Sequence, residues 1–144
     1  MKFYESSLSG KVVIVRIDRD EEVISTLFKV SSQLRLESGF FQGIGAVKKA
    51  LISFYDYQTK SYLDKEINQE MEVLSLLGNI SYHYADDKPF VHAHIVLSDR
   101  NFNLIGGHLK EAIVGVTLEI VIFNVSDRIE RVYNQDFNLF LWKP

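Results

Sequence analysis

The feature that most constrains the fold is a succession of β-branched and aromatic segments separated by short clusters of turn residues. The longest such segment spans residues 114–125 (VGVTLEIVIFNV). Similar segments occupy residues 11–18, 40–45, 46–57, 71–77, 80–84 and 90–97, while residues 128–142 mix strand and loop character. These residue types favour strands, and consecutive strands joined by short turns favour antiparallel pairing. We interpret residues 80–84 as the hairpin partner of residues 71–77.

Only one segment has a strong helical period. Asp20 is a plausible N-cap, and Gly39 is a natural left-handed stop, which predicts a helix over residues 20–37. The apolar positions that recur at helical spacing are Val23, Leu27, Val30 and Leu34. The pattern therefore predicts an α+β fold. We expect a compact single domain over residues 1–144, mainly an antiparallel sheet with one main helix packed on it.

Glycines interrupt the second and third apolar segments. Gly43-Ile44-Gly45 invites comparison with a nucleotide-binding loop, but Lys48 stands where the dinucleotide fingerprint needs its third glycine. The residues that follow are typical of a strand and not of the helix that this fingerprint requires. We therefore interpret this glycine pair as a β-bulge.

The charge balance argues against a dedicated nucleic-acid binder. The chain carries 16 basic and 19 acidic residues, a formal net charge of −3. Phosphate neutralisation by basic residues supplies much of the affinity of DNA-binding proteins, and this sequence has no basic stripe. The nearest approach to an aromatic platform for single strands is Arg128, Arg131, Tyr133 and Phe137. Packing in the core or an interface is the better interpretation of that group.

The absence of cysteine excludes disulfides and thiolate metal sites, and it fits a reducing compartment. The first residues show no basic region followed by an apolar run and a small-residue cleavage site, so we expect no signal peptide. No apolar run reaches the length needed to span a bilayer. We therefore expect a cytoplasmic protein with no membrane partner.

Three of the four histidines fall within residues 90–109 (FVHAHIVLSDRNFNLIGGHL). His92 and His94 are separated by one residue in a predicted strand, so both imidazoles point the same way. A predicted turn at Gly106 and Gly107 then delivers His108, and residues 107–111 could start a short helical segment. Three converging neutral imidazoles form a metal site, and they leave a tetrahedral ion one open position.

Zinc is the expected ion for such a site, although nickel, copper and iron also accept imidazole. The alternative is that these histidines are polar core residues bonded to backbone carbonyls and to Glu119. His83, near a predicted hairpin end, is interpreted as a surface or partly packed residue.

Two carboxylates stand in otherwise apolar segments, Glu72 in MEVLSLL and Glu119 in VTLEIVIF. An acid in such a strand lies either on a solvated face or in a pocket with a partner. Either residue could hold a metal-bound histidine in place or act as a base beside metal-bound water. The alternation of Thr117, Glu119 and Val121 makes Glu119 the better candidate. No nucleophile motif is present, so no catalytic residue can be named.

Several segments together resemble the plant-and-prokaryote-conserved (PPC) domain. They are MEVLSLLGNI (71–80), PFVHAHIVLSD (89–99), IGGHL (105–109) and TLEIVI (117–122), with GIGAV (43–47) and FYD (54–56) earlier in the chain. The resemblance covers nearly the whole chain. It implies a compact α+β domain around an antiparallel sheet and assembly as homotrimers. It also implies a zinc ion on the histidines that match His92, His94 and His108.

In plants the domain follows an AT-hook, an Arg-Gly-Arg-Pro element that enters the minor groove. Free-standing prokaryotic members are called DNA-binding by association. This sequence contains no Arg-Gly-Arg-Pro, so the resemblance implies DNA as a partner without the element that reads it.

These observations favour a binding or regulatory module of the free-standing prokaryotic type over an enzyme. The module would be homotrimeric, with a three-histidine zinc site, and residues 114–123 are the first candidate for the surface between chains. The alternative is a metal-dependent enzyme of hydrolytic type, with Glu119 or Glu72 as its base.

Overall fold

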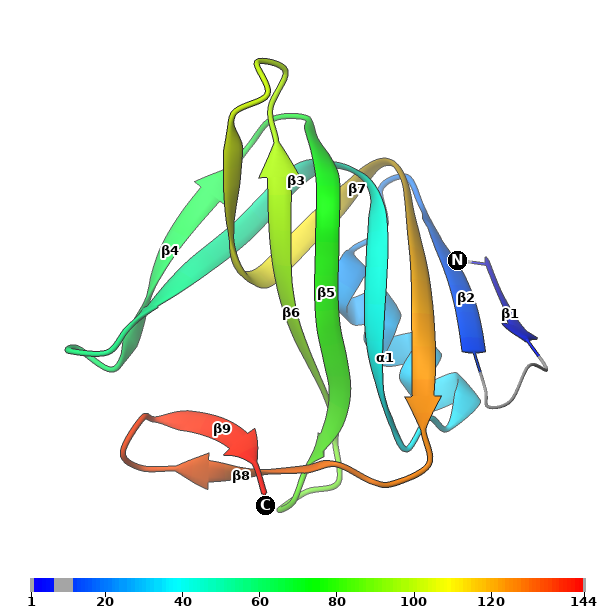
Figure 1. Cartoon of the computed structure of the whole chain (residues 1–144), viewed down its shortest axis with the longest axis vertical. Coiled ribbons are helices and arrows are strands. Elements are labelled where there is room, and N and C mark those ends of the chain that lie inside the picture. The colour runs from blue at the N-terminus through cyan, green and yellow to red at the C-terminus, as the bar shows by residue number, and fades with distance from the viewer. Residues whose placement is uncertain (1, 7–11, 144) are drawn as a thin grey trace.

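One helix and a set of strands make up the described part of the chain, which folds back on itself repeatedly (Figure 1). The computed structural model describes residues 2–6 and 12–143. The elements in chain order are β1 (Lys2–Ser6), β2 (Val12–Asp18), α1 (Val23–Leu34), β3 (Ser38–Asp56), β4 (Ser61–Ile67), β5 (Met71–His83), β6 (Pro89–Ser98), β7 (Leu104–Val125), β8 (Glu130–Asn134) and β9 (Leu139–Trp142).

The strands form one sheet in the order β1-β2-β7-β3-β5-β8-β9, with β4 paired to β3. Strand β6 pairs with both β5 and β7. Because β7 also pairs with β3, and β3 with β5, these four strands close into a ring. The pairs are antiparallel except for β5 with β8, which are parallel. The prediction of a mainly antiparallel sheet is confirmed, and the sheet is mixed.

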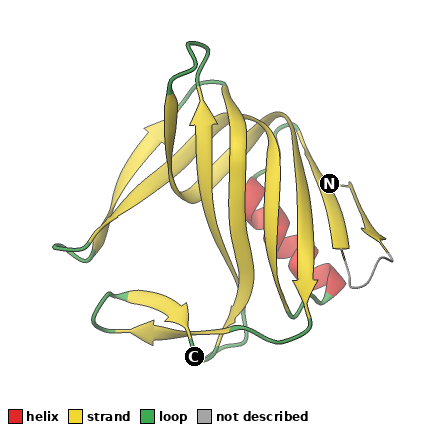
Figure 2. Ribbon diagram, viewed as in Figure 1, coloured by secondary structure: helices red, strands yellow, loops and turns green. Residues whose placement is uncertain are grey.

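The core lies between α1 and the sheet, and Figure 2 shows the helix on one side of the strands. Val23, Leu27 and Val30 of α1 are fully buried in the same apolar cluster as the inward residues of the strands. Among the inward strand residues are Val13, Val15, Ile17, Leu118, Ile120 and Ile122. Burial of these side chains supplies the main driving force for folding.

The helix is shorter than the sequence predicts. Its N-cap is Glu22, whose carboxylate accepts from the backbone N–H groups of Ile24 and Ser25 at 2.9 and 2.6 Å. Asp20 instead has a φ of 70° and pairs with Lys48, so it lies outside the helix. At the other end Arg35 takes the left-handed conformation predicted for a glycine, and the chain enters β3 directly. A side-chain cap at Glu22 explains the late start.

Of two predicted interruptions of strands, one is wrong and the other is confirmed. Residues 71–77 and 80–83 do not form a hairpin but belong to one strand, β5, and Tyr84 follows its end. Gly78 lies in the middle of this strand because Phe41 and the His92 carbonyl approach it closely. A Cβ there would lie 2.3 Å from each. The predicted bulge at Gly43-Ile44-Gly45 is confirmed as a register shift inside β3, which unites residues 40–45 and 46–56.

The predicted turn at Gly106-Gly107 and helical start at residues 107–111 are also wrong, because this segment lies inside β7. Gly106 pairs with Val96 and Gly107 with Ile95. A Cβ on Gly106 would lie 2.5 Å from the Ile95 carbonyl oxygen. The glycines therefore let two strands approach each other rather than turn the chain.

Three further features complete the fold. Strands β1 and β4 have no counterpart in the sequence-based prediction, and residues 128–142 form a hairpin of β8 and β9. Residue 11, predicted to begin the first strand, lies outside the described residues. Within the described ranges, no helix has the length and apolarity to cross a membrane.

Candidate metal centre

Three histidines from two neighbouring strands meet on the side of the sheet that faces away from the core. His92 and His94 alternate along β6 with the buried Ala93 and Ile95, so both imidazoles point outward. His108 in β7 is the direct cross-strand partner of His94. The potential ligand atoms of the three rings lie within 4.8 Å of one another. The convergence that the sequence predicts is therefore present, although a ladder pairing and not a turn produces it.

The ring of His92 is partly buried, and this burial keeps it neutral. Burial lowers its pKa from 6.5 to about 4, and the nearby positive charges of His108, Arg131 and His94 act in the same direction. A neutral imidazole offers a lone pair to a metal ion, whereas an imidazolium does not. At neutral pH His92 is thus in the protonation state that a metal ligand requires.

His108 has the same character. Burial is the main cause that lowers its pKa to about 4, and Lys110 adds to the effect while Asp64 opposes it. Its Nδ1 is buried and has no hydrogen-bond partner among the described residues. A buried ring nitrogen without a partner is costly unless something binds it. The donor set and this nitrogen both fit an ion coordinated by imidazoles.

Strand β4 covers the histidines from one side. The ring of Tyr62 stacks on His108 with centroids 5.0 Å apart and an interplanar angle of 28°. Two positions along β4, the Asp64 carboxylate accepts from Ser53 Oγ at 2.8 Å and from Lys110 Nζ at 2.6 and 2.8 Å. These contacts hold β4 against β3 and β7 and fix the ring that packs on His108.

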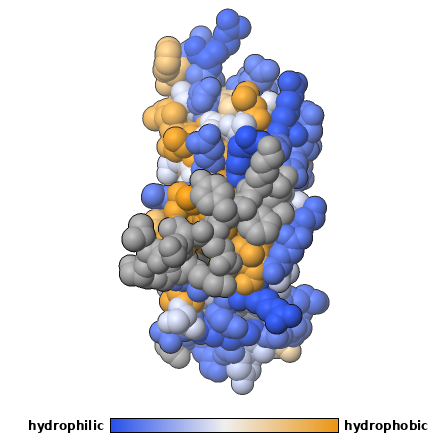
Figure 3. All heavy atoms as spheres, turned by 90° about the vertical axis from the view of Figure 1, so that its right-hand side faces the viewer, coloured by the Kyte–Doolittle hydropathy of each residue, from blue (hydrophilic) through white to orange (hydrophobic). Residues whose placement is uncertain are grey.

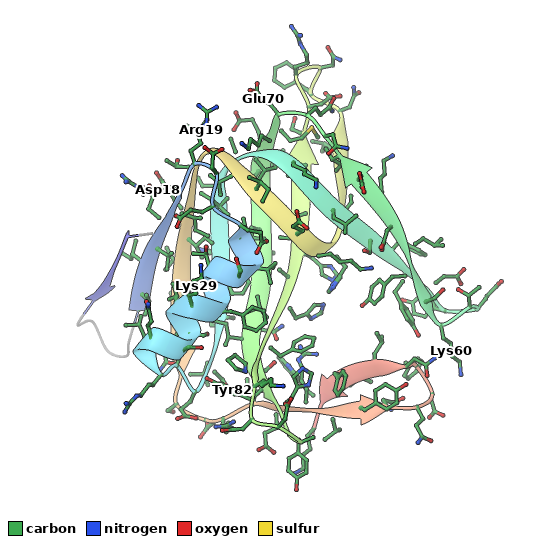
Figure 4. All side chains as sticks on the ribbon, turned by 180° about the vertical axis from the view of Figure 1, so that it is seen from behind. Asp18, Arg19, Lys29, Lys60, Glu70 and Tyr82 are labelled. Carbon is green, nitrogen blue, oxygen red and sulfur yellow. The ribbon has the colours of Figure 1, made fainter. Side chains whose placement is uncertain are left out.

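The hairpin of β8 and β9 covers the histidines from across the cavity, facing strand β4. In Figures 1 and 4 it projects from the sheet on the same side as the β3–β4 hairpin, whose tip carries the labelled Lys60. The Tyr55 hydroxyl donates to the Phe137 carbonyl and joins the two hairpins. A cavity of about 250 Å³ lies between them. It is lined by Tyr62, Phe90, His92, His108, Arg131, Asn138, Leu139, Phe140 and Leu141.

The structure does not bring the two predicted carboxylates to the histidines. Glu119 lies exposed in β7 between Ile44 of β3 and Arg16 of β2. Glu72 lies exposed at the start of β5, opposite Ser98 at the far end of β6 from His92. In the described ranges, the group of metal-ligating side chains around these rings consists of the histidines alone. His83 lies at the end of β5, partly buried between Phe90 and Phe140.

Sequence reasoning missed the side chains that surround the histidines. Phe90 could have been found, because it shares the period of His92 and His94 along β6. Tyr62 could not, since β4 was not predicted. Arg131 was noted only as part of an aromatic group. It reaches the site because β8 pairs in parallel with the end of β5, opposite His83. No local sequence pattern predicts a pairing between segments so far apart in the chain.

The fold and the site define a small protein with a strongly curved, largely antiparallel sheet, one helix, and a histidine triad on the outer face. The chain belongs to the Plants and Prokaryotes Conserved (PCC) domain family, which matches residues 4–126 and is the PPC family that the sequence resembles. The hairpin of β8 and β9 follows the matched region.

Solved structures of similar proteins share the whole fold. A candidate DNA-binding protein of Bacteroides thetaiotaomicron is 30% identical, with a TM-score of 0.89 over 98% of this chain and 96% of that one. A metal-containing protein of Archaeoglobus fulgidus is 30% identical, with a TM-score of 0.85 over 100% and 99%. A PPC protein of Pyrococcus horikoshii is 28% identical, with a TM-score of 0.86 over 99% of this chain and 95% of that one. A comparison with curated proteins found no match.

Proposed function

We propose that this protein is a metal-binding module in which His92, His94 and His108 hold one transition-metal ion, with zinc as the preferred ion. The observation that carries the proposal is the convergence of the three rings within 4.8 Å. The neutral state of His92 and His108 and the unpartnered Nδ1 of His108 support it. The metal-containing relative from Archaeoglobus fulgidus supports it independently. An ion held by three imidazoles supplies a Lewis acid with one position open to a further ligand.

Metal analysis of protein purified without added metal tests the proposal. About one transition-metal ion per chain is expected, as three neutral imidazoles suffice for a site of this kind. His94→Ala should release the ion, and because His94 is exposed the variant should fold. His83→Ala is the matched control, since it removes the histidine outside the triad. Full metal content in His94→Ala, or equal loss in His83→Ala, would contradict the ligand assignment.

We further propose that the chains associate as homotrimers through the outer face of the sheet. Several large apolar side chains are exposed there, namely Phe40, Ile44, Leu77 and Val96. In Figure 3, hydrophobic residues reach the surface on the left, where the outer sheet face lies, whereas hydrophilic residues cover the right. Within residues 114–123 only Val116 is a large exposed apolar residue among those described, so β3, β5 and β6 contribute more of this face. Exposed apolar patches favour association.

DNA binding is a second candidate function, favoured by the name of the Bacteroides thetaiotaomicron relative. The charges of this chain support it less. The net charge is −3, and Lys48, Lys49 and Lys110 each pair with an acidic residue. Metal-dependent hydrolysis has less support again, because Glu119 and Glu72 lie away from the histidines. A base for metal-bound water would have to come from elsewhere.

A further inference from the structure

Arg131 is a buried cation whose contacts leave its charge uncompensated. Its side chain belongs to β8, and the residue is 6% exposed. Its Nε donates to Ser81 Oγ at 2.8 Å, Nη1 to the Phe140 carbonyl at 2.8 Å and Nη2 to Asn79 Oδ1 at 2.9 Å. All three acceptors are neutral.

No acidic side chain in the described ranges forms an ion pair with this guanidinium. The arginine pairs that the structure contains involve Arg16, Arg19 and Arg128 instead. A buried charge without a counter-charge is expensive, and proteins keep such groups mainly where they serve a site. The three neutral acceptors fix the orientation of the guanidinium, so it is held ready for an anion.

The guanidinium faces the cavity beside the histidines. Arg131, His92 and His108 line the same 250 Å³ space, and Nη2 lies 3.5 Å from Nδ1 of His92. The centroid of the Phe90 ring lies 4.7 Å from the guanidinium carbon, and this ring forms an apolar wall. Leu139 and Leu141 extend that wall from β9. The cavity thus joins one fixed positive charge to apolar surface, next to the proposed metal ligands.

We propose that this cavity binds a small organic carboxylate, with its carboxylate group on Arg131 and its carbon chain against Phe90 and Leu139. Arginine presents a planar fork that matches a carboxylate, and the apolar walls select a ligand with a short carbon chain over an inorganic anion. The volume is below the ~300–1,000 Å³ that drug-sized ligands occupy, so the ligand is small. A ligand in this cavity would lie beside the histidines and so next to the proposed metal ion. Its contact with the ion rests on the proposed function, whereas its binding to Arg131 does not.

Propionate and its uncharged counterpart propionamide test the inference by NMR titration of the full-length protein. Propionate should shift the Arg131 Nε–H resonance saturably, whereas propionamide and inorganic phosphate should bind about tenfold more weakly or not at all. Arg131→Gln should weaken propionate binding about tenfold or more. Arg128→Gln is the matched control because Arg128 is a partly exposed arginine that pairs with Glu37 and Asp87 outside the cavity.

A second variant keeps the proposal testable if Arg131→Gln fails to fold. Leu139→Trp fills the cavity but retains the guanidinium, and it should also abolish propionate binding. Unchanged binding in either folded variant, or equal binding of propionate and propionamide, would overturn the carboxylate site. Metal content measured on the same samples reports separately on the triad. Propionate binding in chelator-treated protein would support the carboxylate site even if the protein held no metal. Bound metal without propionate binding would support the histidine triad and overturn the carboxylate site.

Discussion

His94 and His108 are directly opposite each other across the β6–β7 ladder, with ring centroids 5.6 Å apart and ring planes at 88°. The relative position of these two imidazoles is therefore fixed by backbone hydrogen bonding between strands. A site built on paired strands is more rigid than one built on loops. The third ring, His92, joins them from two positions along β6 and lies 5.1 Å from each of the other two centroids.

The first prediction concerns the glycine that lets β6 and β7 approach. Gly106→Ala should lower the free energy of unfolding by about 2 kcal/mol, because the added methyl group would meet the Ile95 carbonyl oxygen at 2.5 Å. Urea denaturation measures the change. Gly115→Ala is the control, since its nearest contact would be 3.2 Å and relieved by a small shift. Equal stability of the two variants would show that the close approach of β6 does not exclude a side chain at residue 106.

The second prediction concerns pH. In metal-free protein the C2 protons of His92 and His108 should titrate near pH 4 instead of 6.5, because burial disfavours the charged rings. The unfolded chain takes up these protons at higher pH than the folded one. The free energy of unfolding should therefore fall as the pH drops from about 6.5 to about 4, and then level off.

Each half-buried ring should contribute about 1–2 kcal/mol to this loss, after allowance for solvent screening. Denaturation of metal-free protein at a series of pH values gives the slope. His108→Gln should reduce the slope by removing one of the two titrating rings. NMR titration of both rings near pH 6.5 would show that their surroundings do not disfavour protonation.

The third prediction concerns self-association. Light scattering should give a mass three times the 16.6 kDa of one chain. Ile44→Lys should shift the protein toward monomer, because Ile44 is 60% exposed on the outer sheet face and a lysine there would be buried in the interface. Tyr57→Lys, at an exposed position in the β3–β4 turn, should leave the mass unchanged. A monomeric mass for the unsubstituted protein would contradict the proposed homotrimer.

The fourth prediction concerns nucleic acid. Anisotropy titration of a labelled duplex at about 50 mM salt should stay flat, because the net charge is −3 and Lys48, Lys49 and Lys110 already pair with acidic residues. Saturable binding that weakens toward about 200 mM salt would instead establish direct DNA contact. The cytoplasmic location inferred from the sequence stays a prediction.

The alternation along β6 was readable from the sequence, because a period of two needs only local information. His92 and His94 were therefore placed on one face correctly. The role of Gly106 and Gly107 was not readable, since a turn and a close strand approach both favour glycine. Only the tertiary pairing with Ile95 and Val96 distinguishes the two.

The predicted boundaries of the helix were wrong for a related reason. Asp20 and Glu22 can both cap a helix, and Lys48, far away in the sequence, pairs with Asp20 outside the helix. Glu72 and Glu119 illustrate the same difficulty for the site. Each was placed correctly in a strand, yet only the register shows that their neighbours are Ser98 on one side and Ile44 and Arg16 on the other.

The terminal hairpin of β8 and β9 brings Arg131 to the site although it follows the region that defines the family. The region matched by the family supplies the histidines and Phe90, whereas the hairpin supplies Arg131 and Leu139 to the same cavity. We expect that grafting another hairpin onto the same scaffold would alter which molecule is accepted while the histidine triad stays intact.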